Sequence, residues 1–167
     1  MLNAVQLLDW PEDIKLVIAG DGTEKSKILH HQKINDRIQY LGKIAYREIP
    51  GLITHSIACL CVKNNITDQF SSGFSPLKVF ETMSCGCSII VSDYPYMADL
   101  VRYFNCGIVI PPNDPLSLAK AVDFLRRNRN AAKKMGENGR RAILECHNWM
   151  TRSVDTYNVI KNILIKK

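Results

Sequence analysis

The sequence predicts an α/β fold in which a doubly wound parallel sheet carries helices on both faces. Short apolar runs alternate with longer amphipathic segments through most of the 167 residues. The apolar runs are continuous, which is typical of parallel strands that are buried on both sides. Regular alternation of such strands with helices predicts right-handed crossovers within a parallel sheet.

Five short runs, rich in aliphatic residues, are expected to form the strands. Residues 15–19 (Lys-Leu-Val-Ile-Ala) show the pattern clearly, and the turn at 20–22 (Gly-Asp-Gly) then leads into a helix. A lone Gly-x-Gly is a weak phosphate-loop signal, so we interpret it mainly as a tight turn. In chain order the expected strands are 15–19, 37–41, 57–62, 88–91 and 108–110.

Helices are expected between and after these strands. Asp114 is a good N-cap, and Pro115 suits the first helical position, which together mark a helix start. In the last helix, side chains from Trp149 to Leu164 fall on one stripe. The expected helices are 3–10 (the end of a helix), 23–32, 46–55, 76–85, 96–104, 115–128, 130–146 and 149–165.

The segment from Ser71 to Pro95 organises the chain as loop, helix, turn and strand. Ser75 is a good N-cap, and Gly86 is expected to end the helix in a left-handed cap. Glu81 lies mid-helix among apolar residues, and a carboxylate there needs a partner. Its partner is either Lys78, in an exposed ion pair, or the hydroxyl pair of a ligand such as a ribose.

The turns after the strands are expected to surround one crevice, because ligands bind beyond the carboxyl ends of parallel strands. These turns contain Gly20, Gly42, the loop 63–75 and the Ser92-Asp93 pair. The start of the helix behind the glycine loop adds free N–H groups, which favour an anion such as phosphate.

Composition indicates a soluble globular chain, with 46% hydrophobic and 23% charged residues. No apolar run reaches the length of a membrane span, and the N-terminus lacks the pattern of a signal peptide. We therefore expect a cytoplasmic protein. Its six cysteines should be reduced. No histidine spacing typical of zinc accompanies them, so no metal site is expected.

Positive charge is concentrated at the C-terminal end. Residues 126–167 carry 11 basic and 3 acidic side chains, whereas residues 1–125 carry 11 basic and 13 acidic ones. These basic helices either form a solvated face or are attracted to another domain or to an anionic membrane surface, peripherally at its inner face. Nucleic-acid binding is not expected, because no aromatic residues interleave with the basic ones.

Several motifs resemble one enzyme family. They are Leu-Val-Ile-Ala-Gly-Asp-Gly at 16–22, Ile-Gln-Tyr-Leu-Gly at 38–42, and the whole run from Gly73 to Asp93. Residues 111–119 and 135–141 agree as well. Together they resemble the C-terminal, donor-binding domain of family 4 retaining glycosyltransferases (glycosyl transferases group 1). The resemblance covers residues 3–165.

The resemblance implies a fold and a reaction. The fold is the C-terminal half of a GT-B fold, a Rossmann-like parallel sheet, so residues 1–167 would form a single domain that binds a nucleotide diphosphate sugar linked to UDP or GDP. The reaction is retaining sugar transfer to an acceptor hydroxyl in polysaccharide or glycolipid synthesis at the cell envelope. It usually needs no metal, and no Asp-x-Asp motif is present in this chain.

The resemblance also implies roles for particular residues. Glu81 would hold the two ribose hydroxyls, and backbone amides at residues 73–75 would face the sugar and phosphates. Lys78 would reach a phosphate or pair with Glu81, and Ile44 would pack against the base or belong to the core. The donor-binding residues implied in this way are Glu81, Gly73, Phe74, Ser75, Lys78 and Ile44.

The chain departs from the family pattern in two places. Gly73 stands where the family has a first glutamate, although Ser75-Pro76-Leu77-Lys78 is similar to a subset of the family with this trait. The family's donor domain also starts with a strand and a glycine-rich turn bearing two cations that clamp the diphosphate. This chain is expected to lack that strand and the N-terminal acceptor domain, and to be inactive alone.

Two other functions remain open at this point. One is a non-catalytic nucleotide-binding or scaffolding half that needs a partner chain. The other is a nucleotide-sugar epimerase-like domain, which would need catalytic carboxylates and a histidine. The four histidines are His30, His31, His55 and His147, and each is expected to be a surface or capping residue. No catalytic residue is therefore assigned with certainty.

Overall fold

The computed structural model describes residues 1–63 and 77–165. Within this part of the chain the predicted strands all form, each within one residue of its expected bounds at either end. Every neighbouring pair of strands is parallel, as predicted. The strands are β1 (Leu16–Ala19), β2 (Ile38–Gly42), β3 (Ala58–Cys61), β4 (Ser88–Ser92) and β5 (Gly107–Ile110).

The helices follow the predicted order, but several differ from their expected bounds: the helix expected over 23–32 lies two residues later, and the one expected over 46–55 begins as a 3-10 turn. The first helix ends at Val5, so Trp10 lies beyond it, and the helix expected over 130–146 ends at Ala142 and continues as a π-helical turn. The helical elements are α1 (Leu2–Val5), α2 (Lys25–Ile34), the 3-10 turn η1 (Tyr46–Glu48), α3 (Ile49–Thr54), α4 (Leu77–Ser84), α5 (Met97–Phe104), α6 (Pro115–Arg127), α7 (Arg129–Ala142), the π turn η3 (Ile143–His147) and α8 (Trp149–Ile165).

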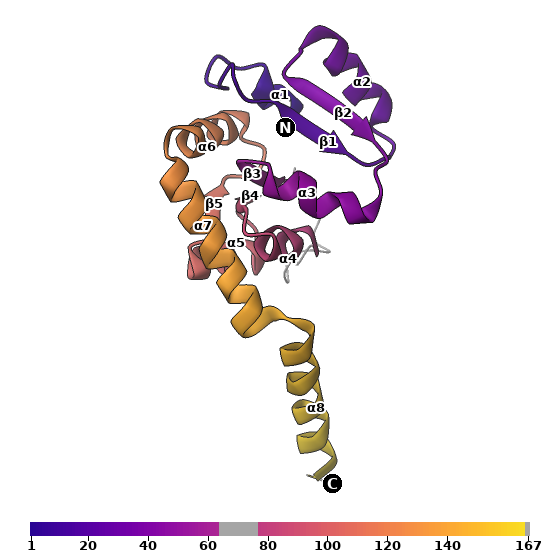
Figure 1. The fold of residues 1–167 in the computed structure, drawn as a ribbon, viewed down its shortest axis with the longest axis vertical. Coiled ribbons are helices and arrows are strands. Elements are labelled where there is room, and N and C mark those ends of the chain that lie inside the picture. Colours follow the sequence, from indigo (N-terminus) through magenta and orange to yellow (C-terminus); the bar gives the residue numbers. More distant parts are fainter. Residues whose placement is uncertain (64–76, 166–167) are drawn as a thin grey trace.

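The parallel strands form two separate sheets rather than one. β1 pairs with β2, and β4 lies between β3 and β5 (Figure 1). A doubly wound sheet in the order 3-2-1-4-5-6 would give this arrangement if its central strand were left out. Among the described residues no strand lies between β1 and β3.

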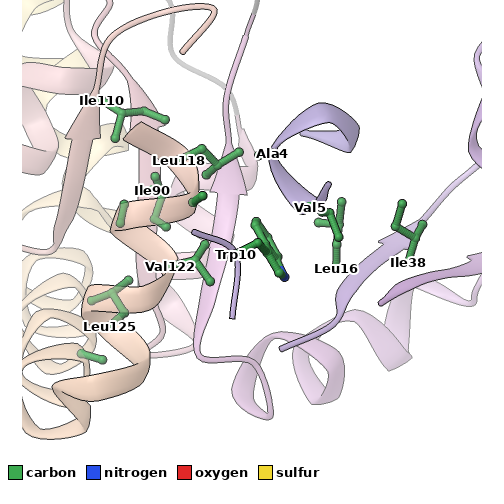
Figure 2. Packing of buried hydrophobic residues seen from close by; sticks show 13 residues of the cluster. Ala4, Val5, Trp10, Leu16, Ile38, Ile90, Ile110, Leu118, Val122 and Leu125 are labelled. Atoms are coloured by element: carbon green, nitrogen blue, oxygen red, sulfur yellow. The ribbon is translucent and has the colours of Figure 1, made fainter. Parts of the chain in front are cut away.

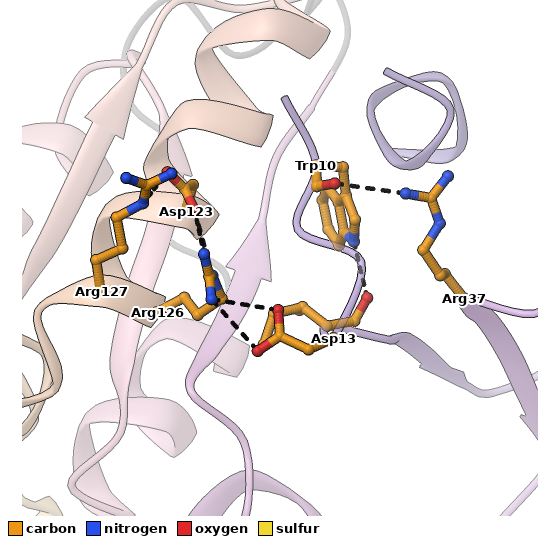
Figure 3. A network of polar contacts seen from close by, with 7 residues as sticks. Trp10, Asp13, Arg37, Asp123, Arg126 and Arg127 are labelled. Carbon is orange, nitrogen blue, oxygen red and sulfur yellow. Dashed lines mark hydrogen bonds and ion pairs between the residues drawn. The ribbon is translucent and has the colours of Figure 1, made fainter. Parts of the chain in front are cut away.

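An apolar cluster joins the two sheets. Trp10 is 2% exposed and lies between β1 and α6, with Leu16 on one side and Val122 and Leu125 on the other (Figure 2). Polar contacts surround the same junction. The Trp10 indole N–H donates to the Ile14 carbonyl at 2.9 Å, and a guanidinium nitrogen of Arg126 lies 3.5 Å from Asp13 (Figure 3).

A second core surrounds the other face of β4. Ile89 and Val91 pack there with Met83 of α4, whereas Ile90 belongs to the first cluster. α7 closes this core by a close backbone approach. A Cβ atom at Gly136 would lie 2.0 Å from the carbonyl oxygen of Gly86, so only glycine fits at position 136.

α8 extends away from the rest of the molecule (Figure 1). Its expected stripe is exposed to solvent, with Trp149 82%, Tyr157 63% and Leu164 68% exposed. None of the helices described combines the length and apolar character that crossing a membrane requires.

Candidate functional site

Glu81 lies in the middle of α4 with its side chain half-buried. Val79, Thr82 and Met83 form the buried face of this helix, and Glu81 lies at the border between that face and solvent. Gly86 adopts a φ of +69° just after the helix, which confirms the predicted left-handed cap.

The partner of Glu81 is a tyrosine. The Tyr46 hydroxyl donates to Oε1 of Glu81 at 3.0 Å, and Tyr46 comes from η1. Within the described residues no ion pair joins Lys78 to Glu81, so the first partner considered for this carboxylate is not the one found. The hydrogen bond to the Glu81 carboxylate, and then its negative charge, raise the pKa of Tyr46 above its usual value.

Two cavities meet at Glu81. One, of about 620 Å³, lies between the edges of β1 and β3, and both Lys78 and Glu81 line it. We name it the interstrand slot. The other, of about 720 Å³, lies among η1, α3, α4 and the start of α8, and we name it the helical pocket. Glu81 lines both cavities.

The helical pocket is also lined by a cationic residue, Arg152. Arg152 of α8 donates to the Tyr96 hydroxyl at 3.2 Å, and its guanidinium lies 2.9 Å from Nδ1 of His147. The His147 ring also packs against Phe80 and Phe104. Burial, and then the charge of Arg152, lower the pKa of His147. His147 is half-buried and packs in this cluster at the surface of the molecule.

The other predicted donor-binding residues have different places. Gly73, Phe74 and Ser75 lie outside the described residues. Ile44 is half-buried in the link between β2 and η1, two residues before Tyr46, and it lines neither cavity. Lys78 is exposed on α4. The structure therefore brings Lys78 and Glu81 to one cavity. Ile44 is close in sequence to Tyr46, which lines the helical pocket, but does not line either cavity itself.

The turns after the strands are joined in pairs. The Gly20 N–H donates to the Gly42 carbonyl at 2.8 Å, which connects the ends of β1 and β2. The Ser92 hydroxyl accepts from the Lys63 N–H at 2.9 Å, which connects the ends of β4 and β3. Asp93 forms a 2.6 Å ion pair with Arg102. Among residues 1–63 and 77–165, no three His, Cys, Asp or Glu side chains gather where they could hold a metal ion.

The family model described as "Glycosyl transferases group 1" matches residues 1–142. The chain belongs to this family. An uncharacterized glycosyltransferase of Methanocaldococcus jannaschii is 27% identical over 164 residues, covering 95% of this chain and 40% of the relative. The alpha-D-kanosaminyltransferase of Streptomyces kanamyceticus is 25% identical, covering 81% of this chain and 34% of that enzyme. This glycosyltransferase chain thus spans about two fifths of its curated relatives.

Solved structures show the same fold in this group 1 chain. The Anabaena protein HepE, solved in complex with UDP, superposes with a TM-score of 0.80 at 17% identity, covering 96% of this chain and 44% of that one. Sucrose-phosphate synthase from Thermosynechococcus elongatus superposes with a TM-score of 0.72 at 16% identity and covers 50% of that chain. The fold is therefore half of a GT-B glycosyltransferase.

Sequence reasoning missed two polar residues of this glycosyltransferase chain, Tyr46 and Arg152. Tyr46 is 35 residues from Glu81 along the chain, and no motif links them. Arg152 belongs to the basic end that we noted only for its net charge. Neither local pattern shows that η1 and the start of α8 line one pocket with α4, so no sequence signal was available for these residues.

Proposed function

We propose that this chain is the donor-binding half of a retaining glycosyltransferase and binds a nucleotide diphosphate sugar. UDP is the first candidate nucleotide, because the similar Anabaena protein was solved with UDP and with UDP-glucose. The family match supports sugar transfer, and the position of Glu81 supports donor binding.

The observation that carries the proposal is the hydrogen bonding of Glu81. Its Oε1 accepts one bond from the Tyr46 hydroxyl, and Oε2 accepts none from the residues described. A carboxylate can accept several hydrogen bonds, and those from neutral donors to an ionised acceptor are strong. The two hydroxyls of a ribose are such donors, and they lie close enough to engage one carboxylate together.

In the proposed reaction the sugar passes from the nucleotide diphosphate to an acceptor hydroxyl with its anomeric configuration retained. Negative charge then grows on the leaving diphosphate, and preorganised N–H groups and cations stabilise it. Lys78 is exposed and lines the slot together with Glu81, and it would contribute one such charge. Residues 73–75 would contribute backbone amides, and the acceptor would be a polysaccharide or glycolipid precursor.

Transfer would require an acceptor-binding part beyond residues 1–167, since the curated relatives are about two and a half times as long. The basic residues of 126–167 would attract that part or an anionic membrane surface. We therefore expect donor binding by this chain alone, and transfer only when an acceptor-binding part is present.

Calorimetric titration of the chain with UDP and GDP tests the proposal. Glu81→Ala should weaken nucleotide binding about 10- to 100-fold, because hydrogen bonds to a charged group contribute about 1.5–3 kcal/mol. Glu137→Ala is the matched control, since Glu137 is an exposed glutamate in the middle of another helix, α7. It should leave the affinity unchanged.

Equal weakening by both substitutions would remove Glu81 from the site. A folded chain that binds neither nucleotide would contradict the proposal and favour the scaffolding function instead. Tighter binding of UDP or of GDP by the parent chain would identify the base of the donor nucleotide.

A further inference from the structure

The guanidinium of Arg152, in the first turn of α8, forms no ion pair within the part of the chain that the structure describes. Arg102, Arg126 and Arg127 each pair instead with an aspartate. Arg152 lines the helical pocket, so its positive charge is open to an anionic group of a ligand there. Hydrogen bonds between a guanidinium and an anion are among the strong ones in proteins.

Two contacts hold this guanidinium in place. Its Nη2 donates to the Tyr96 hydroxyl at 3.2 Å and lies 2.9 Å from Nδ1 of His147. Because a guanidinium has no acceptor, Nδ1 of His147 accepts the second bond. Both N–H groups of Nη2 are then used, whereas those of Nε and Nη1 donate to none of the residues described. These remaining donors suit the oxygens of a phosphate, which arginine recognises through several N–H groups at once.

The partners of Arg152 are themselves fixed by packing. Tyr96 stands at the N-cap of α5, and the His147 ring packs against Phe80 and Phe104. The charged end of Arg152 is therefore oriented before a ligand arrives, although its side chain is exposed. Preorganisation of this kind reduces the entropy that is lost on binding.

The helical pocket also offers aromatic surfaces. Tyr46, Phe80, Tyr96 and Trp149 all line it, and nucleic-acid bases stack readily on such rings. Of the described residues that line the interstrand slot, Trp10 alone has a Tyr, Phe or Trp ring, and it is almost fully buried. A planar base therefore finds more ring surface in the helical pocket than in the slot.

Glu81 adds a third kind of group to the same pocket. Its carboxylate accepts hydroxyl donors, as the bond from Tyr46 shows. The pocket thus combines a hydroxyl acceptor, a phosphate donor and aromatic walls in about 720 Å³, a volume within the usual range of small-molecule sites. A nucleoside diphosphate carries the three matching groups, namely ribose hydroxyls, phosphates and a planar base.

We propose that the helical pocket, and not the interstrand slot, receives the nucleoside diphosphate of the donor, and that Arg152 binds its phosphates. This inference rests on the proposed function and deepens it. It chooses between the two cavities that meet at Glu81, and it adds a cation from α8 that no motif of the sequence singled out. In sugar transfer this cation would also face the diphosphate as its negative charge grows.

Calorimetry with two ligands tests the inference. The probes are whichever of UDP and GDP the parent chain binds more tightly, and the corresponding nucleoside, measured by displacement. Arg152→Met keeps a long unbranched side chain and removes the charge. It should weaken binding of the nucleoside diphosphate at least about tenfold. It should change binding of the nucleoside less than about twofold, because a nucleoside has no phosphate.

Three further variants sharpen the result. Lys78 lines the slot and not the helical pocket, so Lys78→Met should weaken nucleotide binding less than Arg152→Met does. Arg152→Lys keeps the charge without the planar set of donors, and its affinity should lie between those of the parent and Arg152→Met. Arg129→Met is the matched control, since Arg129 is an exposed arginine of α7. It should bind both ligands like the parent.

Four results would overturn the inference. Unchanged nucleotide binding by Arg152→Met would do so and leave the proposed function standing. A loss confined to Lys78→Met would place the diphosphate in the interstrand slot. Equal losses of nucleotide and nucleoside in Arg152→Met would mean that Arg152 shapes the pocket and does not bind phosphate. A folded parent chain that binds neither nucleotide would remove the proposed function and this inference together.

Discussion

The hydrogen bond between Tyr46 and Glu81 gives the candidate site an exchangeable partner. Tyr46 is 77% exposed, so its hydroxyl can return to water when another donor takes its place. A carboxylate with no partner at all would be costly to keep half-buried. Tyr46 therefore satisfies Glu81 in the free chain, and a ribose hydroxyl could replace it or add to it.

The same pair predicts a pH effect at a single residue. Because the Glu81 carboxylate raises the pKa of Tyr46, this phenol should ionise above the usual tyrosine range. The bond is complete below the ordinary tyrosine pKa and is lost as pH rises through the raised value. In Glu81→Gln the Tyr46 titration should move down toward ordinary values, as measured from its ring carbon in NMR. Glu137→Gln should leave it unchanged, and an identical titration in all three proteins would contradict the assignment.

The site could be predicted from sequence only as far as local patterns reach. Glu81 and the cap at Gly86 follow from the order of residues within one helix. Tyr46 and Arg152 reach the site through the packing of η1 and α8, which depends on contacts far apart in the sequence. Lys78 was one of two partners considered for Glu81, and the sequence could not show that a tyrosine 35 residues away donates to this carboxylate instead.

At the scale of elements, the contact of α7 with the turn after α4 depends on one glycine. Gly136 approaches Gly86 so closely that any side chain would collide with backbone. This explains why the run 135–141 contains glycines inside a helix, where glycine is otherwise unfavourable. The approach at Gly139 is looser, since a Cβ atom there would lie 3.2 Å from the Met83 side chain and 3.3 Å from that of Cys106.

Gly136→Ala should therefore destabilise the protein by about 1–3 kcal/mol or more, because the backbone of α7 must shift away from Gly86. Gly51→Ala is the control, since Gly51 lies in α3 with open space around it. It should be neutral or stabilising by up to about 1 kcal/mol through helix propensity. Urea unfolding followed by circular dichroism measures both. A Gly136→Ala midpoint equal to that of the parent would show that the contact is not tight.

The bounds of the strands were predicted closely because each strand is marked by a short, continuous run of apolar residues. Helix ends were predicted less well where tertiary contacts decide them. Trp10 continues the apolar pattern of the first helix, yet it is buried against α6 and its indole bonds to Ile14 in the following turn. Likewise His147 packs between Phe80 and Phe104, at the end of the π-helical turn that follows α7.

For the molecule as a whole, apolar packing rather than charge holds the two sheets together. Trp10 is almost fully buried between them. The ion pair of Asp13 and Arg126 bridges the same junction, but its side chains are 60% and 31% exposed. Exposed pairs of this kind contribute only about 0–1 kcal/mol.

Trp10→Ala should thus cost about 3–5 kcal/mol of unfolding free energy, whereas Asp13→Asn should cost less than about 1 kcal/mol. Chemical denaturation of both variants gives the comparison. Hydrogen exchange would show whether β1 and β2 loosen first in Trp10→Ala. A larger loss in Asp13→Asn would mean that the ion pair, and not the indole, joins the sheets.

The position of Trp10 has a consequence during synthesis. Its packing partners Val122 and Leu125 lie more than one hundred residues later in the chain. At translation rates of about 5–20 residues per second, they emerge roughly 6–23 seconds after the indole. For that interval the apolar face of β1 has no cover from α6, and a nascent chain would depend on the ribosome surface or a chaperone to shield it.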